Sequence, residues 1–237
     1  MRFKIKRNKM LEGPRRPLYP ARKMLIVKTP TAKTPHPLRK GEKSIHKANS
    51  VLSEKITMVP AGYMAKVIEK RPDWLKVPGV KSIYSVSGCI SKNFADYTNF
   101  WKHNKYWFFD SAEVIKKVSK ENNIDLSNAE FLYYEIYEKE FNEDSEAWID
   151  FKGEDSFGYN VKAPNKKKLL GYDIVSYTER TTPECSPLSC NSLAQKVNVN
   201  QFSLLDSFEE CKKIVESPDI KTGEPGPYRI LAVYKID

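Results

Sequence analysis

The chain has 237 residues, of which 40% are hydrophobic and 30% are charged, and its formal net charge is +10. This composition is typical of a globular protein with enough apolar material for a core, and it excludes a fibrous or wholly disordered chain. The apolar runs are far shorter than the roughly 20 residues that a membrane-spanning helix needs, and no apolar segment follows the basic N-terminus. We therefore expect a cytoplasmic protein with no membrane partner and no secretory signal.

The positive charge is concentrated at one end of the chain. Residues 1–57 contain 16 Lys or Arg and three acids, a net of +13, whereas residues 58–237 contain 24 basic and 27 acidic residues, a net of −3. Only the N-terminal segment therefore has the charge that attracts nucleic acid or another acidic partner.

The segment 1–57 also contains repeated prolines and no sustained hydrophobic period. Proline removes a backbone donor and disfavours helical geometry in the residue before it. We expect a basic, disordered arm. Two other interpretations stay open: Met24, Met58 and Met64 offer alternative starts, so the arm could be an over-extended start, or it could be a targeting segment.

Local patterns predict a single α+β domain over residues 65–237. The predicted elements are strands at 81–87, 130–141, 169–178 and 228–236, helices at 110–120 and 206–216, and a short helix at 191–197. The second long helix begins with a capping-box spacing, Ser207 and Glu210, in which each side chain binds a backbone N–H of the other residue.

The two predicted long helices form part of an internal repeat. Residues 110–118 (DSAEVIKKV) align without gaps with residues 206–214 (DSFEECKKI), and five of nine positions are identical. Capping preferences explain most of these identities, but not the equal spacing from each helix to the following strand. The order β-α-β-β-α-β predicts a ferredoxin-like split arrangement, with an antiparallel sheet and both helices on one face. The loops 88–109 and 179–205 then occupy equivalent places, and we expect any site there.

Three of the four cysteines lie in those two loops. Cys185 and Cys190 have the upper spacing of a zinc-binding pair, but a second ligand pair is missing from the sequence, so we expect no metal and no cofactor. An ordered loop with small buried thiols and a redox-active pair are the other interpretations. Cys89 lies 14 residues before His103, and a thiol–imidazole pair of this kind could activate a nucleophile. Cys211 falls on the apolar side of the second helix and is assigned to the core.

Aromatic and basic residues provide candidates for a binding surface. The strand 170–177 shares a Gly, a Val and two Tyr with one strand of RNA-recognition domains, but it lacks the central aromatic on which a base would stack. We therefore do not assign the chain to that family. The candidate binding residues are Trp101, Lys102, Lys105, Tyr172 and Tyr177.

Two functions remain open from the sequence. The first is a non-enzymatic binding protein whose arm contacts nucleic acid or an acidic protein. The second is a thiol-dependent enzyme that uses Cys89 or the loop containing Cys185 and Cys190. The phosphate-binding, zinc-protease, hydrolase and calcium-loop motifs are absent from the sequence, so no other catalytic class gains support.

Overall fold

The computed structural model describes residues 56–90, 92, 103–154, 157–177, 183–191 and 193–236. Most of the predicted arm, 1–57, lies outside these residues, as do the candidates Trp101 and Lys102. Within the described part of the chain, no helix has both the length and the apolar character needed to cross a membrane.

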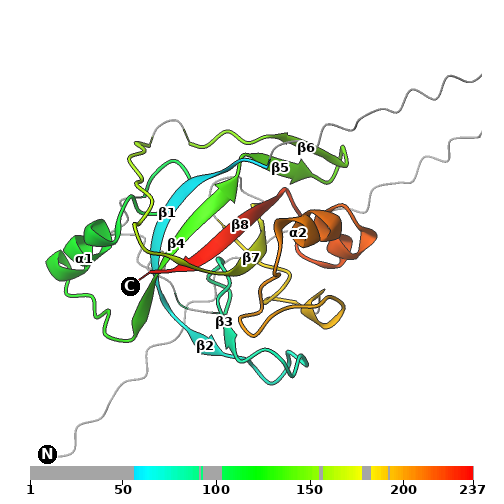
Figure 1. Cartoon of the computed structure of the whole chain (residues 1–237), viewed down its shortest axis with the longest axis horizontal. Helices are drawn as coiled ribbons and strands as arrows, with labels where there is room; N and C mark the ends of the chain where they lie inside the picture. Colours follow the sequence, from blue (N-terminus) through cyan, green and yellow to red (C-terminus); the bar gives the residue numbers. More distant parts are fainter. Residues whose placement is uncertain are drawn as a thin grey trace, which may run out of the picture. The chain divides into compact units, whose positions relative to one another are not determined.

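The domain is a mixed α/β structure built around an antiparallel sheet (Figure 1). Its strands are β1 (Met58–Val67), β4 (Ala129–Tyr137), β5 (Lys139–Asn142), β6 (Ala147–Asp150), β7 (Lys168–Ser176) and β8 (Tyr228–Lys235). Strand β8 pairs with β4 on one side and with β7 on the other, and β1 pairs with the outer side of β4. The central order is therefore β1-β4-β8-β7, and β6 extends the sheet from β5.

The prediction of an α+β domain is confirmed as far as a mixture of helices with an antiparallel sheet, but the ferredoxin-like order is wrong. That arrangement requires the two strands around each helix to be parallel, with another strand between them. Instead, β1 and β4 are antiparallel neighbours, and so are β7 and β8. The connections contain long loops besides a helix, so the chain can reverse direction and the crossover rule for parallel strands does not apply.

The first long strand also differs from the prediction. Strand β1 begins at Met58, upstream of the predicted domain boundary at 65. The predicted strand 81–87 contains only the two-residue strand β3 (Ser82–Ile83), which pairs with β2 (Glu69–Lys70). The remainder of 81–87 is an irregular loop whose polar groups are bound by side chains from the sheet, as described below.

The predicted helices are confirmed. Helix α1 (Ala112–Glu121) begins after Ser111, whose hydroxyl accepts from Val114 N–H. Helix α2 (Phe208–Val215) begins after Ser207 and has the predicted capping box with Glu210. The predicted short helix is the 3₁₀ helix η3 (Leu193–Gln195), and a second one, η4 (Pro218–Thr222), follows α2.

An asparagine-centred turn precedes each helix, and it shows that the repeat is structural. In the first half, Asn104 Nδ2 donates to the Ala61 carbonyl at 2.9 Å and to Asp110 Oδ1 at 3.2 Å. Its Oδ1 accepts from the backbone N–H groups of Tyr106 and Phe108.

In the second half, Asn200 makes the same bonds, 96 positions later. Its Nδ2 donates to the Leu170 carbonyl at 2.9 Å and to Asp206 Oδ1 at 3.1 Å. Its Oδ1 accepts from the N–H groups of Phe202 and Leu204. Capping preferences alone do not produce such a turn, so the two halves share one architecture.

Each asparagine turn lies against a glycine in the neighbouring strand. Gly62 of β1 and Gly171 of β7 have φ values of 139° and 147°, and each lies at a register shift in its strand. A Cβ added at Gly62 would be 2.6 Å from the Phe109 carbonyl, and one at Gly171 would be 2.7 Å from the Leu205 carbonyl. Both positions therefore require glycine for its conformation and for the close approach of the turn.

Apolar side chains bury both faces of the sheet. Helix α2 packs against side chains of β4, β7 and β8, among them Tyr137, Ile174 and Tyr228. Helix α1 contacts β1 at the opposite end of the sheet (Figure 1). Burial on both faces leaves the loops as the places where polar chemistry meets solvent.

Candidate functional site: a three-cysteine cluster

Three thiols from the two equivalent loops meet at one point. The Sγ atoms of Cys89, Cys185 and Cys190 all lie within 4.8 Å of one another. Cys89 and Cys185 are in direct contact, with their sulfurs 2.6 Å apart, although 96 positions separate them in the sequence. Cys89 is exposed and the other two are half-buried, so the cluster is accessible from solvent.

A buried lysine fixes the loop that leads to Cys89. Lys66 projects from β1 and is fully buried. Its ammonium group donates to the carbonyls of Ser85 at 2.5 Å, Val86 at 3.3 Å and Ser87 at 2.6 Å. Three carbonyls that converge on one cation give the loop that leads to Cys89 a defined shape.

A buried aspartate joins the two cysteine loops. Asp173 projects from β7 and accepts from Val86 N–H at 2.7 Å and from Ser85 Oγ at 3.2 Å. Its other oxygen accepts from Ser186 Oγ at 2.5 Å, next to Cys185. One carboxylate thus connects the loop of Cys89 to the loop of Cys185 and Cys190. Burial raises the pKa of Asp173 to about 6 despite these hydrogen bonds.

The hydrogen bonds within the cluster favour ionisation of Cys190. A bond from the Cys89 thiol is the largest effect, and bonds from the Ser87 hydroxyl and the Cys185 thiol add to it. They lower the pKa of Cys190 to about 5, although burial opposes the shift. The same proton sharing with Cys190 raises the pKa of Cys89, and burial raises the pKa of Cys185 to about 11. Cys190 is therefore the first thiol of the cluster to lose its proton as the pH rises.

His103, the predicted partner of Cys89, does not belong to this cluster. Its ring stacks on Trp107 with the ring centroids 3.8 Å apart, and it also contacts Phe157. Burial lowers the pKa of His103, which keeps the imidazole neutral at physiological pH. Cys211 lies on the buried side of α2 in the core, as the sequence predicts.

The three described residues of the predicted binding set each have different surroundings. Lys105 Nζ lies over the rings of Tyr106 and Tyr159, at 4.9 Å and 4.6 Å from their centroids. Tyr172 is half-buried and pairs with the asparagine turn of the second half. Tyr177 is 1% exposed, so its ring is not available for stacking on a base.

Sequence reasoning missed Lys66 and Asp173, and it also missed a buried arginine in the last strand. Arg229 is fully buried and its guanidinium carbon lies 3.2 Å from the centroid of Phe151. Burial lowers the pKa of Arg229 to about 10. A charged residue inside an otherwise apolar strand is the signal that could have identified all three residues, since unpaired charges are rarely buried.

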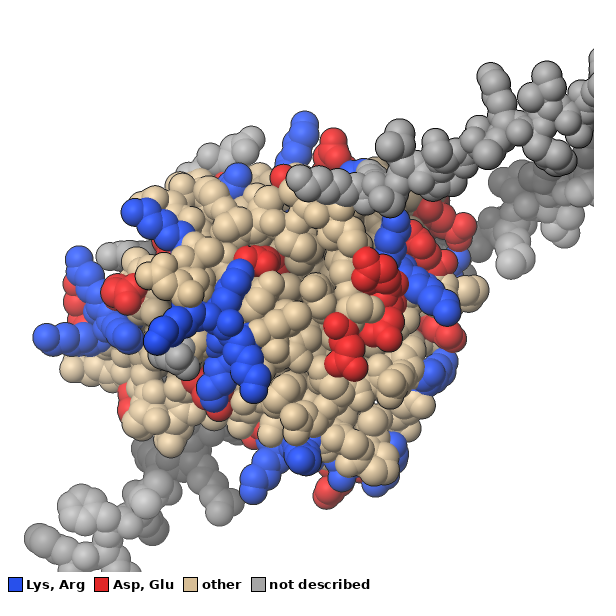
Figure 2. All heavy atoms as spheres, in the orientation of Figure 1, with Lys and Arg blue, Asp and Glu red and all other residues tan. Residues whose placement is uncertain are grey.

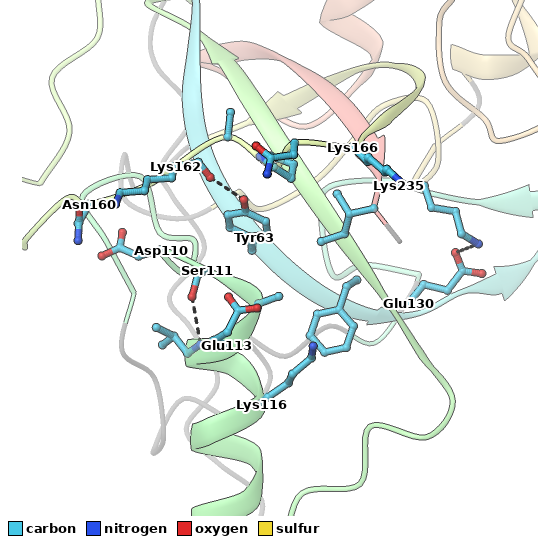
Figure 3. Close-up of a pocket in the computed structure, with 17 residues that line it drawn as sticks. Tyr63, Asp110, Ser111, Glu113, Lys116, Glu130, Asn160, Lys162, Lys166 and Lys235 are labelled. Carbon is cyan, nitrogen blue, oxygen red and sulfur yellow. Dashed lines mark hydrogen bonds and ion pairs between the residues drawn. The ribbon is translucent and has the colours of Figure 1, made fainter.

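A separate cavity of about 1090 Å³ is lined by the start of α1, by the segment 160–166 and by residues of β1, β4 and β8 (Figure 3). The Tyr63 hydroxyl donates to the Lys162 carbonyl on one side, and Lys235 pairs with Glu130 on the other. Lys and Arg side chains also gather at the α1 end of the face shown in Figure 2. The cavity mixes lysines with acids and contains no cysteine, so it does not contribute to the thiol cluster.

Comparison with protein-family models, curated proteins and solved structures found no match for this chain. The functional assignment therefore depends on the geometry of the site.

Proposed function

We propose that the chain is a thiol–disulfide exchange protein in which Cys190 is the nucleophile and Cys89 the resolving thiol. The convergence of three thiols from two loops within 4.8 Å carries this proposal. Exchange requires a thiolate, a second thiol within reach of it and access for a disulfide substrate. The lowered pKa of Cys190 meets the first requirement, and the partial exposure of Cys190 beside the exposed Cys89 meets the last.

The exchange proceeds in two steps that balance in atoms and electrons. The Cys190 thiolate attacks one sulfur of a substrate disulfide, which forms a mixed disulfide and releases the other sulfur as a thiolate. The Cys89 thiol loses its proton to solvent and attacks Cys190 Sγ. This step forms an internal disulfide and expels the second substrate thiolate. Two electrons pass from the protein to the substrate, and the released thiolates take up protons.

The supporting residues position the thiols and do not react. Lys66 holds the backbone of the Cys89 loop, and Asp173 ties this loop to the loop of Cys190. The substrate class is a disulfide that reaches an exposed cluster, for which glutathione disulfide is a suitable probe. Regeneration of the reduced protein requires two equivalents of an external thiol, such as glutathione, which leave as the oxidised disulfide.

The pH profile of thiol labelling tests the assignment of Cys190. We expect the reduced protein to react with a chromogenic aromatic disulfide at a rate whose midpoint lies near pH 5. Cys190→Ser should move the midpoint toward the ordinary thiol range, whereas Cys211→Ala, which removes the buried thiol outside the cluster, should leave it in place. A wild-type profile that rises only above pH 8, or one that Cys190→Ser does not change, would contradict the proposal.

The concentration of positive charge in residues 1–57 supports a second function of the chain, in which this arm binds nucleic acid. Residues 1–57 carry a net of +13 in a chain whose remainder is nearly neutral. Deletion of 1–57 should abolish salt-dependent binding to a duplex and leave thiol exchange intact. Unchanged binding after the deletion would exclude this role.

A further inference from the structure

The positions of the three sulfurs in the cluster also suit the binding of a metal ion. A tetrahedral zinc ion bound by thiolates at about 2.3 Å holds its sulfur ligands about 3.8 Å apart. The sulfurs of Cys89, Cys185 and Cys190 lie within 4.8 Å of one another, so a single ion placed between them reaches all three. We propose that these three cysteines form a binding site for one thiophilic cation, with Zn²⁺ as the reference ion.

Binding requires only a small rearrangement of the side chains. Cys89 and Cys185 are 2.6 Å apart at sulfur, so this pair must separate by roughly 1.2 Å to reach the spacing of zinc ligands. Cys89 is exposed and lies beyond the carbonyls that Lys66 holds, so a change in its side-chain rotamer supplies the movement. The backbone that Lys66 and Asp173 fix does not need to move.

The donor set selects the class of ion. Three thiolates are soft ligands, which favour Zn²⁺ and Cu(I) over the oxygen-preferring Mg²⁺ and Ca²⁺. Cys185 and Cys190 have a spacing of four intervening residues, at the upper end of the range for zinc-binding pairs. The second ligand pair is missing from the local sequence, but the other half of the domain supplies Cys89 as a third ligand.

Groups around the sulfurs support a charged site. Ser87 Oγ and Ser189 Oγ lie 3.6 Å and 3.7 Å from Cys190 Sγ, where they can donate hydrogen bonds to a thiolate. The Lys66 ammonium binds the Ser87 carbonyl at 2.6 Å and so fixes the backbone of the residue whose hydroxyl lies next to Cys190. Such outer groups orient the ligands and tune the affinity for the metal.

The site leaves one coordination position open. Among the described residues, no histidine, aspartate, glutamate or further cysteine joins the three thiols in this cluster. Because Cys89 is exposed, the fourth position faces solvent and can take water or an external ligand. Three protein ligands with an open position are typical of a reactive zinc site, whereas structural sites are closed by four.

Zinc binding goes beyond the proposed exchange function and does not depend on it. A bound ion occupies the sulfurs that exchange uses, so Zn²⁺ should suppress exchange, and the internal disulfide should prevent metal binding. The two activities therefore alternate on the same three residues and can be measured separately.

Metal titration of the full chain, reduced with a phosphine and kept anaerobic, tests the site. We expect one Co²⁺ per chain with thiolate charge-transfer absorption, and displacement of Co²⁺ by one Zn²⁺. Cys89→Ser, Cys185→Ser and Cys190→Ser should each weaken Zn²⁺ binding by at least about 10-fold. Cys211→Ala is the matched control and should bind as the wild type does.

Two results would overturn the proposal: no metal bound by the fully reduced wild type, or wild-type affinity in the Cys89→Ser variant, which changes an exposed residue and should fold. The exchange assay on chelator-treated protein keeps the two proposals distinguishable. A protein that exchanges disulfides but binds no Zn²⁺ refutes only the metal site, and the reverse result refutes only the exchange function.

Discussion

The two halves of the domain have the same scaffold but different buried charges. Counted from the paired glycines Gly62 and Gly171, Lys66 of β1 corresponds to Val175 of β7, and Asp173 of β7 corresponds to Met64 of β1. All four side chains are buried. The scaffold therefore explains the fold, whereas the unmatched lysine and aspartate explain why the cysteine loops adopt one fixed arrangement.

The largest effect on stability is expected for substitution of Lys66, and it should exceed the effect of substituting its counterpart, Val175. Lys66→Met leaves three buried carbonyls without their donor and should lower the free energy of unfolding by about 4 kcal/mol. Val175→Ala removes only apolar contact and should cost about 2 kcal/mol. Denaturant unfolding measures both values. Lys66→Met should also slow the labelling of Cys190, whereas Val175→Ala should not, and equal effects on labelling would contradict a positioning role for Lys66.

Asp173 should make the stability of the domain depend on pH, whereas its counterpart Met64 has no group that titrates. Its pKa is about 6 in the folded protein and 3.8 when unperturbed, so the folded state binds the extra proton between these values. Stability should therefore fall as the pH rises through this window, by roughly 3 kcal/mol in total. Asp173→Asn should remove this slope.

The pH experiment requires a background without the reactive thiolate. The lowered pKa of Cys190 stabilises the folded state as the pH rises above 5, which is a slope of opposite sign. The unfolding free energy is therefore measured in Cys190→Ser, with Met64→Leu as the control. A slope that persists in Asp173→Asn would assign it to another group.

Removal of the asparagine from either turn should destabilise the domain, but by different amounts. Asn104 is 2% exposed, whereas Asn200 is only half-buried, although both make the same set of hydrogen bonds. Asn104→Ala should cost about 3 kcal/mol and Asn200→Ala about 2 kcal/mol, because unsatisfied groups cost more when water cannot reach them. Thermal unfolding of the two variants measures the difference, and a larger loss for Asn200→Ala would reverse the ranking.

The sequence predicted the elements that local chemistry determines. Ser207 and Glu210 mark the start of α2 because a capping box is complete within four residues. Strand β1 was missed because Pro60 and Gly62 interrupt its pattern and both of its faces are buried. The strand order was missed because it depends on long-range pairing, which local periodicity does not encode.

The cysteine site was only partly predictable for the same reason. The sequence placed Cys89, Cys185 and Cys190 in equivalent loops, but the contact between Cys89 and Cys185 exists only after the pairing of β4 with β8 has brought the two halves together. The nearest histidine in the sequence, His103, was a poor guide because its ring packs on Trp107. Spacing rules detect ligands within one loop and fail for a site shared by two.

Disulfide mapping tests most directly whether thiols of the two halves form one site. The reduced, metal-free full chain is incubated with glutathione disulfide, alkylated and digested without reduction. Our account predicts a cross-link that joins Cys89 to the segment 183–191, with Cys211 unmodified until the protein unfolds. If Cys89 carries only glutathione or remains a free thiol while the segment 183–191 is oxidised, the three cysteines do not act together and the account is wrong.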